Sequence, residues 1–240
     1  MPLCRLCHQD RTLRRSHIIP EFLFEDLYNA KHQMIGIHGL GVKGWIIQQK
    51  GIREPLFCER CEQFFNEHFE KPFQRIWIEN FPLPDPWSFE GVHWIKIEYE
   101  PFKLFHLSVL FRASVSALPT FADVSLGPHE ERLRNILLAR RAGPEDQYPV
   151  FGYAVVHHQT RRIVQLVSRF QAGRFDGRRC YGVIYGGVQW WIFVASDPNS
   201  CFQNASLRTN GSMPLIPIPW NELSLLQEAK SALRRAGSQQ

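Results

Sequence analysis

The sequence predicts an α+β protein in which a small N-terminal module, residues 1–75, precedes a larger mixed α/β-strand domain, residues 76–240. Three observations support this prediction. Two Cys-x-x-Cys pairs frame most of the N-terminal part, and prolines punctuate the stretch from Pro72 to Pro86, as they do at many domain boundaries. Beyond that stretch, alternating strand-like patterns and helix-like periodicity are interleaved along the chain.

Local patterns predict two helices and a hairpin in the N-terminal module. Pro20 and the acidic residues that follow it are typical of a helix start. Residues 33–50 are rich in glycine and β-branched residues, which predicts two strands joined by a glycine turn. A second helix is predicted from Glu62 to about Phe69, with Phe65 and Phe69 on one face.

The larger domain is predicted to contain both helices and strands. A proline followed by acidic residues marks one helix start, and Gly186-Gly187 splits the last strand pattern as a hairpin turn would. The predicted helices cover about residues 102–118, 128–141 and 220–236, the predicted strands about 92–99, 148–156, 162–168 and 181–195, and the predicted loop 198–214.

The composition is that of a globular protein. The chain has 240 residues, of which 44% are hydrophobic, 13% aromatic and 21% charged, and this balance excludes a disordered chain. Its apolar runs are shorter than the roughly 20 residues of a membrane span, and the N-terminus has no apolar signal-peptide core. We therefore expect a cytoplasmic protein with no membrane partner. The formal net charge of +5 favours nucleic acid as a partner without establishing it.

The paired cysteines predict a structural zinc site. In a reducing compartment such pairs bind metal more often than they form disulfides. Each pair offers two thiolates from one tight turn, and Zn²⁺ prefers four ligands in a tetrahedron. The predicted ligands are Cys4, Cys7, Cys58 and Cys61. The metal would fasten the N-terminus to the helix predicted at Glu62 and would stabilise a module too small for a large core. Cys180 and Cys201 stand alone.

The segment Ser16-His17-Ile18-Ile19-Pro20 lies between the two cysteine pairs. Together with Cys4-x-x-Cys7 before it and Leu56-Phe57-Cys58-x-x-Cys61 after it, it resembles HNH nucleases, the ββα-metal family. The resemblance covers about residues 1–70. It implies a ββα-metal module in a metal-dependent endonuclease that hydrolyses nucleic-acid phosphodiesters.

The resemblance also implies roles for individual residues. His17 would be the general base that takes a proton from water. Glu62 stands where the family has a metal-binding histidine, and Asn66 lies one helical turn further on. As oxygen donors on one helix face, this pair could bind one Mg²⁺ or Mn²⁺ ion in place of the usual histidines, and the ion would stabilise charge on the phosphate. Each residue could equally be a solvated helix residue, and for Asn66 taken alone that interpretation is favoured. Glu67 and His68 are alternatives that point away from that face.

The chain departs from the family pattern at three positions. Ser16 replaces an Asp or His metal ligand, Arg53 replaces a structural asparagine, and Glu62 replaces the histidine. Arg53 is expected to contact a phosphate. Two functions stay open: an active endonuclease, or a decayed site whose zinc knuckle binds nucleic acid or protein. A role as a bacterial antiphage-defence effector rests on the resemblance alone, and a homodimer or a partner protein is compatible with both functions.

Two patterns in the larger domain indicate function less strongly than the N-terminal motifs do. Residues 105–116 and 126–131 resemble a widespread group of bacterial proteins that pair a SHIIP-type zinc knuckle with such a domain, which implies no activity. His129 and Glu130 could belong to a site, but an acidic helix start explains them as well.

Clustered arginines predict nucleic-acid binding, with DNA expected over RNA. Interleaved aromatic residues, namely Phe170, Phe175 and Tyr181, could stack on bases. A solvated hairpin face explains the same pattern equally well. The arginines in question are Arg14 and Arg15 beside the first cysteine pair, and Arg161, Arg162, Arg169, Arg174, Arg178 and Arg179, which are expected to crowd one β region.

Overall fold

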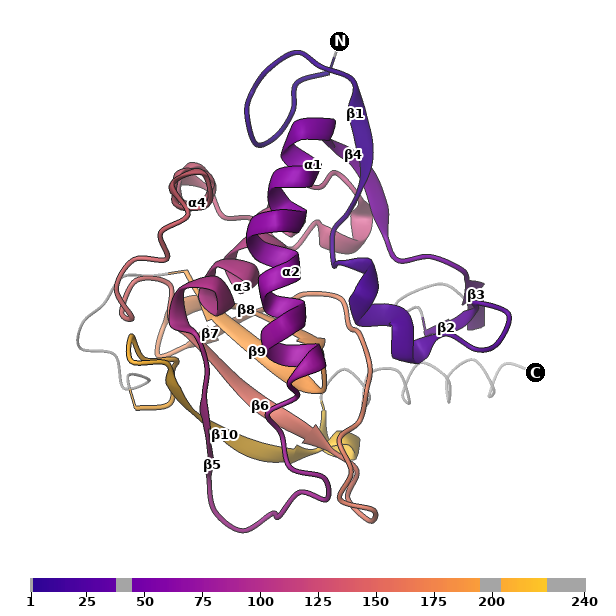
Figure 1. Ribbon diagram of the computed structural model, residues 1–240, viewed down its shortest axis with the longest axis vertical. Helices are drawn as coiled ribbons and strands as arrows, with labels where there is room; N and C mark the ends of the chain where they lie inside the picture. Colours follow the sequence, from indigo (N-terminus) through magenta and orange to yellow (C-terminus); the bar gives the residue numbers. More distant parts are fainter. Residues whose placement is uncertain (1, 38–44, 195–203, 224–240) are drawn as a thin grey trace.

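The larger part of the chain forms a six-stranded sheet with helices packed on it, and a long helix links this sheet to the N-terminal cysteines (Figure 1). The computed structural model describes residues 2–37, 45–194 and 204–223. Helices α2 and α3 cross one face of the sheet (Figure 1). The predicted α+β class is confirmed.

The sheet is mixed, with the strand order β5-β10-β6-β9-β8-β7. All neighbours pair antiparallel except β10 and β6, which are parallel. Gly186 and Gly187 join β8 to β9 as predicted, and both have a positive φ, which a two-residue hairpin turn of this kind requires. The strands are β5 (His93–Lys96), β6 (Val150–Val156), β7 (Gln171–Phe175), β8 (Arg178–Tyr185), β9 (Val188–Phe193) and β10 (Ser212–Pro219).

Two assignments made from the sequence, one strand and one loop, need correction. The strand predicted at 162–168 is wrong, because in the described chain this segment forms one isolated antiparallel bridge, between Ile163 and Val156, and then turns to a different strand instead of continuing a ladder. Val164 N–H donates to Val155 O, and Ser168 N–H donates to Ile184 O. The predicted loop 198–214 overlaps the start of β10, whose three prolines (SMPLIPIP) argue against a strand by propensity.

A continuous helical segment follows the second cysteine pair. It consists of α1 (Glu59–Phe65), η2 (Asn66–Glu70), α2 (Lys71–Phe73) and η3 (Gln74–Glu79). The predicted helix 62–69 therefore starts too late and ends too early. Wide π-type turns on both sides of Pro72 let the helix continue past a residue that lacks a backbone N–H. The boundary predicted at residue 75 lies inside this helix and stays a prediction.

The other helices correspond to their sequence patterns. The helix predicted at 102–118 is α3 (Tyr99–Ser114), and the one predicted at 128–141 is α4 (Pro128–Ala139). A short turn, η4 (Pro119–Phe121), lies between them. Of the helix predicted at 220–236, only η5 (Trp220–Glu222) lies within the described residues.

Aromatic side chains pack the long helix against α3 and the sheet. The Phe73 and Phe105 rings stack with centroids 3.7 Å apart, and the Trp77 ring lies 5.1 Å from Trp190 in β9. Trp77 Nε1 also donates a hydrogen bond to Gly186 O at 2.8 Å. One cluster of buried side chains extends from the cysteines to the sheet, so the helix is held at both ends by the same core.

The N-terminal region is built on two paired strands. β1 (Leu13–His17) and β4 (Arg53–Cys58) pair antiparallel, and α1 follows β4 directly. Charged residues and Pro55 break the alternating pattern, so sequence reasoning missed both strands. The helix expected after Pro20 is the 3-10 segment η1 (Glu21–Leu27). The predicted hairpin corresponds to β2 (Met34–Ile37) and β3 (Trp45–Gln48).

Candidate functional site

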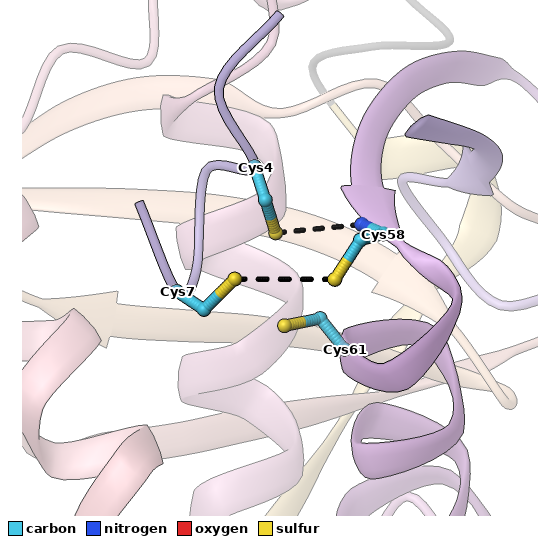
Figure 2. A group of neighbouring side chains, drawn as sticks. All are labelled: Cys4, Cys7, Cys58 and Cys61. Carbon is cyan, nitrogen blue, oxygen red and sulfur yellow. Dashed lines mark hydrogen bonds between the residues drawn. The ribbon is translucent and has the colours of Figure 1, made fainter. Parts of the chain in front are cut away.

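The four predicted cysteine ligands converge (Figure 2). Their Sγ atoms all lie within 4.8 Å of one another, and the Sγ atoms of Cys7 and Cys58 are 3.9 Å apart. A tetrahedral zinc ion with Zn–S bonds of about 2.3 Å separates its sulfurs by about 3.8 Å. The donor set and its spacing therefore fit a metal such as zinc.

Backbone hydrogen bonds hold the first cysteine turn against β4. His8 N–H donates to Cys4 O at 2.9 Å, and His8 has a φ of 56°, which closes the turn. Arg5 N–H donates to Leu56 O at 3.0 Å. Cys58 N–H donates to Cys4 Sγ at 3.4 Å, so the second cysteine turn supports a thiolate of the first (Figure 2).

The surroundings of Cys4 favour its thiolate. The Cys61 thiol, together with backbone N–H groups, donates to Cys4 Sγ and lowers the pKa of Cys4 to about 4, although burial opposes this. The pKa of Cys61 is raised, because its proton is shared with Cys4 and because it is buried. Thiolate is the form that binds a metal ion. Cys180 is buried in a separate aromatic cluster, and Cys201 lies outside the described residues.

An arginine from α4 supports the same turn. Arg134 Nη1 donates to Leu6 O at 2.7 Å, and its other nitrogens form a fork with Glu131 at 2.7 Å. The sequence contained no signal for this contact, because it joins segments far apart in the chain. The cysteine turn is thus tied to β4 and to α4.

His17 ends β1 and is largely buried, with 26% of its side chain exposed. Its Nε2 lies 2.8 Å from Glu21 Oε2, outside hydrogen-bonding geometry, and has no hydrogen-bond partner among the described residues. Burial lowers the pKa of His17; the Glu21 carboxylate raises it and the Arg53 guanidinium lowers it. The net effect lowers the pKa, so the imidazole is neutral at neutral pH.

Glu21 is a neighbour of His17 that sequence reasoning missed. Tyr28 OH donates to Oε1 at 2.5 Å, and Gly51 N–H donates to Oε2 at 3.2 Å. Burial raises the pKa of Glu21, but these two hydrogen bonds and His17 lower it overall. A charged carboxylate therefore faces the imidazole. The spacing of four residues between His17 and Glu21 was the available signal.

Ser16 and Glu62 are in direct contact. Ser16 is buried, donates from Oγ to Glu62 Oε1 at 2.5 Å, and accepts a hydrogen bond from Phe57 N–H at 3.2 Å. Burial raises the pKa of Glu62, while the bond from Ser16 opposes the rise. The fold thus joins the two positions to which the resemblance assigns metal ligands.

Asn66 does not join this contact. It is exposed, and a π-type turn begins at Asn66, so the regular spacing of an α-helix does not continue beyond it. The charge of Glu70, further along the helix, raises the pKa of both His17 and Glu62. Within the described ranges, the four cysteines are the one group of three or more His, Cys, Asp and Glu side chains close enough to bind a metal.

Arg112 reaches this region from α3. It is buried, its Nη1 donates to His17 O at 3.1 Å, and its Nη2 donates to Glu70 Oε1 at 2.5 Å. Its Cζ lies 4.4 Å from the centroid of the Phe65 ring. The only signal in the sequence was an arginine inside a largely apolar helix, which also carries Lys103.

Arg53 faces His17 across the strand pair and lines a shallow hollow of about 360 Å³. Three cations and no acidic side chain line the hollow in the described chain. Its lining residues are Arg15, Gln49, Lys50, Gly51, Ile52 and Arg53. An anionic group such as a phosphate would suit this charge.

The other predicted nucleic-acid-binding arginines are dispersed. Arg14 pairs with Glu59, and Arg162 pairs with Asp85 at 3.2 Å. The expectation that the arginines of residues 161–179 crowd one β region holds for Arg174 and Arg179, which are cross-strand partners in β7 and β8, and is wrong for 161–162. Residues 178–179 begin β8, whereas 161–162 adjoin Ile163, which packs on Gly187 beyond the other end of β8. At about 3.3 Å per residue, the two ends are roughly 23 Å apart.

The aromatic residues expected to stack on bases are mostly buried. Phe170 and Tyr181 are almost fully inaccessible, and Tyr181 OH donates to Ser125 O at 2.6 Å. His129 Nδ1 lies 2.9 Å from Tyr148 OH at the start of α4, which is consistent with a structural role for that residue.

None of the described helices is long and apolar enough to cross a membrane. Comparison of the chain with family models, with curated proteins and with solved structures finds no match.

Proposed function

We propose that the protein is a metal-dependent, HNH-type endonuclease that hydrolyses nucleic-acid phosphodiesters. The observation that carries the proposal is the position of His17, a largely buried histidine with a lowered pKa that directly follows Ser16, the partner of Glu62. β1, β4 and α1 would form its ββα-metal module.

The four cysteines would hold one zinc ion. A zinc ion with four thiolate ligands has no open position for water, so its contribution is structural. It would hold the two turns together at the point where β4 passes into α1. Because Glu62 follows Cys61 directly, the zinc site would also fix the position of the Glu62 side chain.

His17 would act as the general base. A neutral imidazole can take a proton from water, and burial favours that form. Nε2 faces Glu21, so Nδ1 is the nitrogen that would receive the proton, and the Glu21 carboxylate would stabilise the resulting imidazolium. Glu62 would hold Mg²⁺ or Mn²⁺, which stabilises charge on the phosphate and on the leaving oxygen. Water and the substrate would supply the remaining ligands.

The basic hollow would hold a substrate phosphate. Arg53 is the cross-strand neighbour of His17, and Arg15 and Lys50 line the same hollow. A phosphate bound there would lie beside the base, and its affinity would depend on salt. We expect DNA rather than RNA as the substrate, and a role in antiphage defence is a further proposal that rests on the resemblance alone.

The direct test is cleavage of supercoiled plasmid with Mg²⁺ or Mn²⁺. Loss of a general base typically lowers the rate about 10²- to 10⁴-fold, so His17→Ala should lose cleavage to that extent. His158→Ala is the matched control, because His158 is exposed in a distant turn. Equal cleavage by the wild-type protein and His17→Ala would contradict the proposal.

A second candidate is a binding module whose catalytic site has decayed. The observation that favours it is the closed Ser16–Glu62 contact, in which Ser16 replaces a metal ligand and already uses its hydroxyl group for two hydrogen bonds. Retained affinity for nucleic acid without cleavage under any divalent ion would support this candidate instead.

A further inference from the structure

Arg112 is a charged group that the proposed function does not yet use. Only 3% of its side chain is exposed, and it lies in α3 among apolar residues that are themselves buried. Removing a guanidinium from water is costly unless it is well partnered. The burial of Arg112 therefore depends on the groups that its guanidinium contacts.

The partners of Arg112 come from two other elements. Nη2 contacts Glu70 in η2 at 2.5 Å, and Nη1 donates to the carbonyl oxygen of His17 at the end of β1 at 3.1 Å. The planar guanidinium holds both partners at fixed angles, which a lysine cannot do. The Phe65 ring covers the guanidinium at 4.4 Å, and Nε has no hydrogen-bond partner among the described residues.

These contacts act where β1 ends and the chain turns at Pro20. Ile18 N–H donates to Ile52 O at 3.1 Å, so the peptide between His17 and Ile18 is held from both sides. Without Arg112, the carbonyl side of that peptide would lose its donor. The His17 ring would then be free to shift relative to Glu62.

We propose that Arg112 and Glu70 form a clamp that positions His17, so that α3 completes the site. This inference rests on the proposed function, in which His17 is the base. The clamp does not touch the reacting atoms. Arg112 and Glu70 are therefore positioning residues. Glu70 also raises the pKa of His17 and Glu62, and Arg112 lowers it.

A purely structural role makes a different prediction. Replacing a buried ion pair by uncharged residues is often neutral or stabilising for the fold. The double variant Arg112→Met/Glu70→Gln removes both charges and leaves no unpaired one. We expect it to fold and retain zinc, yet to lose about 10- to 100-fold in kcat with little change in KM, as misplaced catalytic groups do.

A second readout does not need activity. In ¹⁵N-labelled protein, the imidazole signals of His17 are assigned by their loss in His17→Gln, and we expect them to move in the double variant. Arg112→Lys keeps the charge but cannot hold both partners, so it should shift the same signals and serves if the double variant does not fold. The control is Arg75→Met/Glu98→Gln, which removes an exposed ion pair that also involves the long helix.

The outcomes separate the clamp from the nuclease proposal. Moved His17 signals in the clamp variants, with none in the control, support the clamp even if the wild-type protein cleaves nothing. His17 signals that match wild type in the double variant or in Arg112→Lys would overturn it, even if the wild-type protein cleaves DNA. A loss of zinc that parallels the loss of kcat would reduce Arg112 to a structural residue and would also overturn it.

Discussion

Trp77 fixes the far end of the long helix to the sheet, and Trp77→Phe tests that attachment. The indole is fully buried, and its Nε1 donates to Gly186 O at 2.8 Å in the turn between β8 and β9. Gly186 has a φ of 58°, and a Cβ there would lie 2.7 Å from Trp77 Nε1, so the turn and the indole are closely fitted. Phenylalanine keeps an aromatic ring but removes the donor.

The expected loss of stability is about 3 kcal/mol. A buried carbonyl left without its donor costs about 1–3 kcal/mol, and the smaller ring leaves a cavity that costs about 1–2 kcal/mol more. For a chain of this length, each kcal/mol lowers Tm by about 2–4 °C, so Tm should fall by about 6–12 °C. The zinc content should not change, because the cysteines lie at the other end of the helix.

Urea and thermal unfolding of both proteins, followed by circular dichroism, measure the effect. Trp94→Phe is the matched control, because Trp94 is 56% exposed and should lose little stability. A loss below about 1 kcal/mol in Trp77→Phe, or a loss equal to that of the control, would refute the reasoning. If residues 1–75 unfold separately from the sheet, two transitions should appear.

Three other predictions follow from the site. Elemental analysis should find about one zinc ion per chain in the wild-type protein and less in Cys61→Ser, with a lower Tm after chelation; a metal-free wild-type protein of equal stability would contradict the zinc assignment. Burial lowers the pKa of His17 below its usual value of about 6.5, so the neutral base form persists as the pH falls from 7 to about 6.5. Single-turnover cleavage should therefore decline only at a pH below about 6.5. A decline centred above pH 7 would exclude His17 as the base. Arg53→Gln should weaken DNA binding and reduce the slope of log K against log salt by about 0.7–0.9 for each phosphate that the protein no longer neutralises, whereas an unchanged slope would remove Arg53 from the phosphate site.

The cysteine group was predictable because its chemistry is local. Each Cys-x-x-Cys pair places two sulfurs in one turn, and the structure brings the two pairs within 4.8 Å. The glycine turn between β8 and β9 was predictable for a similar reason, since Gly186-Gly187 is a two-residue signal read directly from the chain.

The ends of the elements were less predictable, because tertiary contacts override local propensity. Pro72 suggested a break, but π-type turns carry the helix on to Glu79, where Trp77 meets the sheet. β10 forms despite its prolines because it lies between β5 and β6. The arginine cluster was predicted correctly only in part, because Arg174 and Arg179 pair across β7 and β8 whereas residues 161–162 lie beyond the other end of β8.

By itself the sequence determined the α+β class, the four cysteines that could bind a metal and the candidacy of His17. Only the tertiary structure decided what surrounds His17. Glu21 faces its ring, Ser16 turns to Glu62, and Arg112, 95 residues away, holds its carbonyl oxygen. The physical reason is that a tight turn or a Cys-x-x-Cys pair depends on the spacing of a few residues along the chain. A buried arginine, in contrast, contacts its partners only when α3, β1 and the long helix pack together.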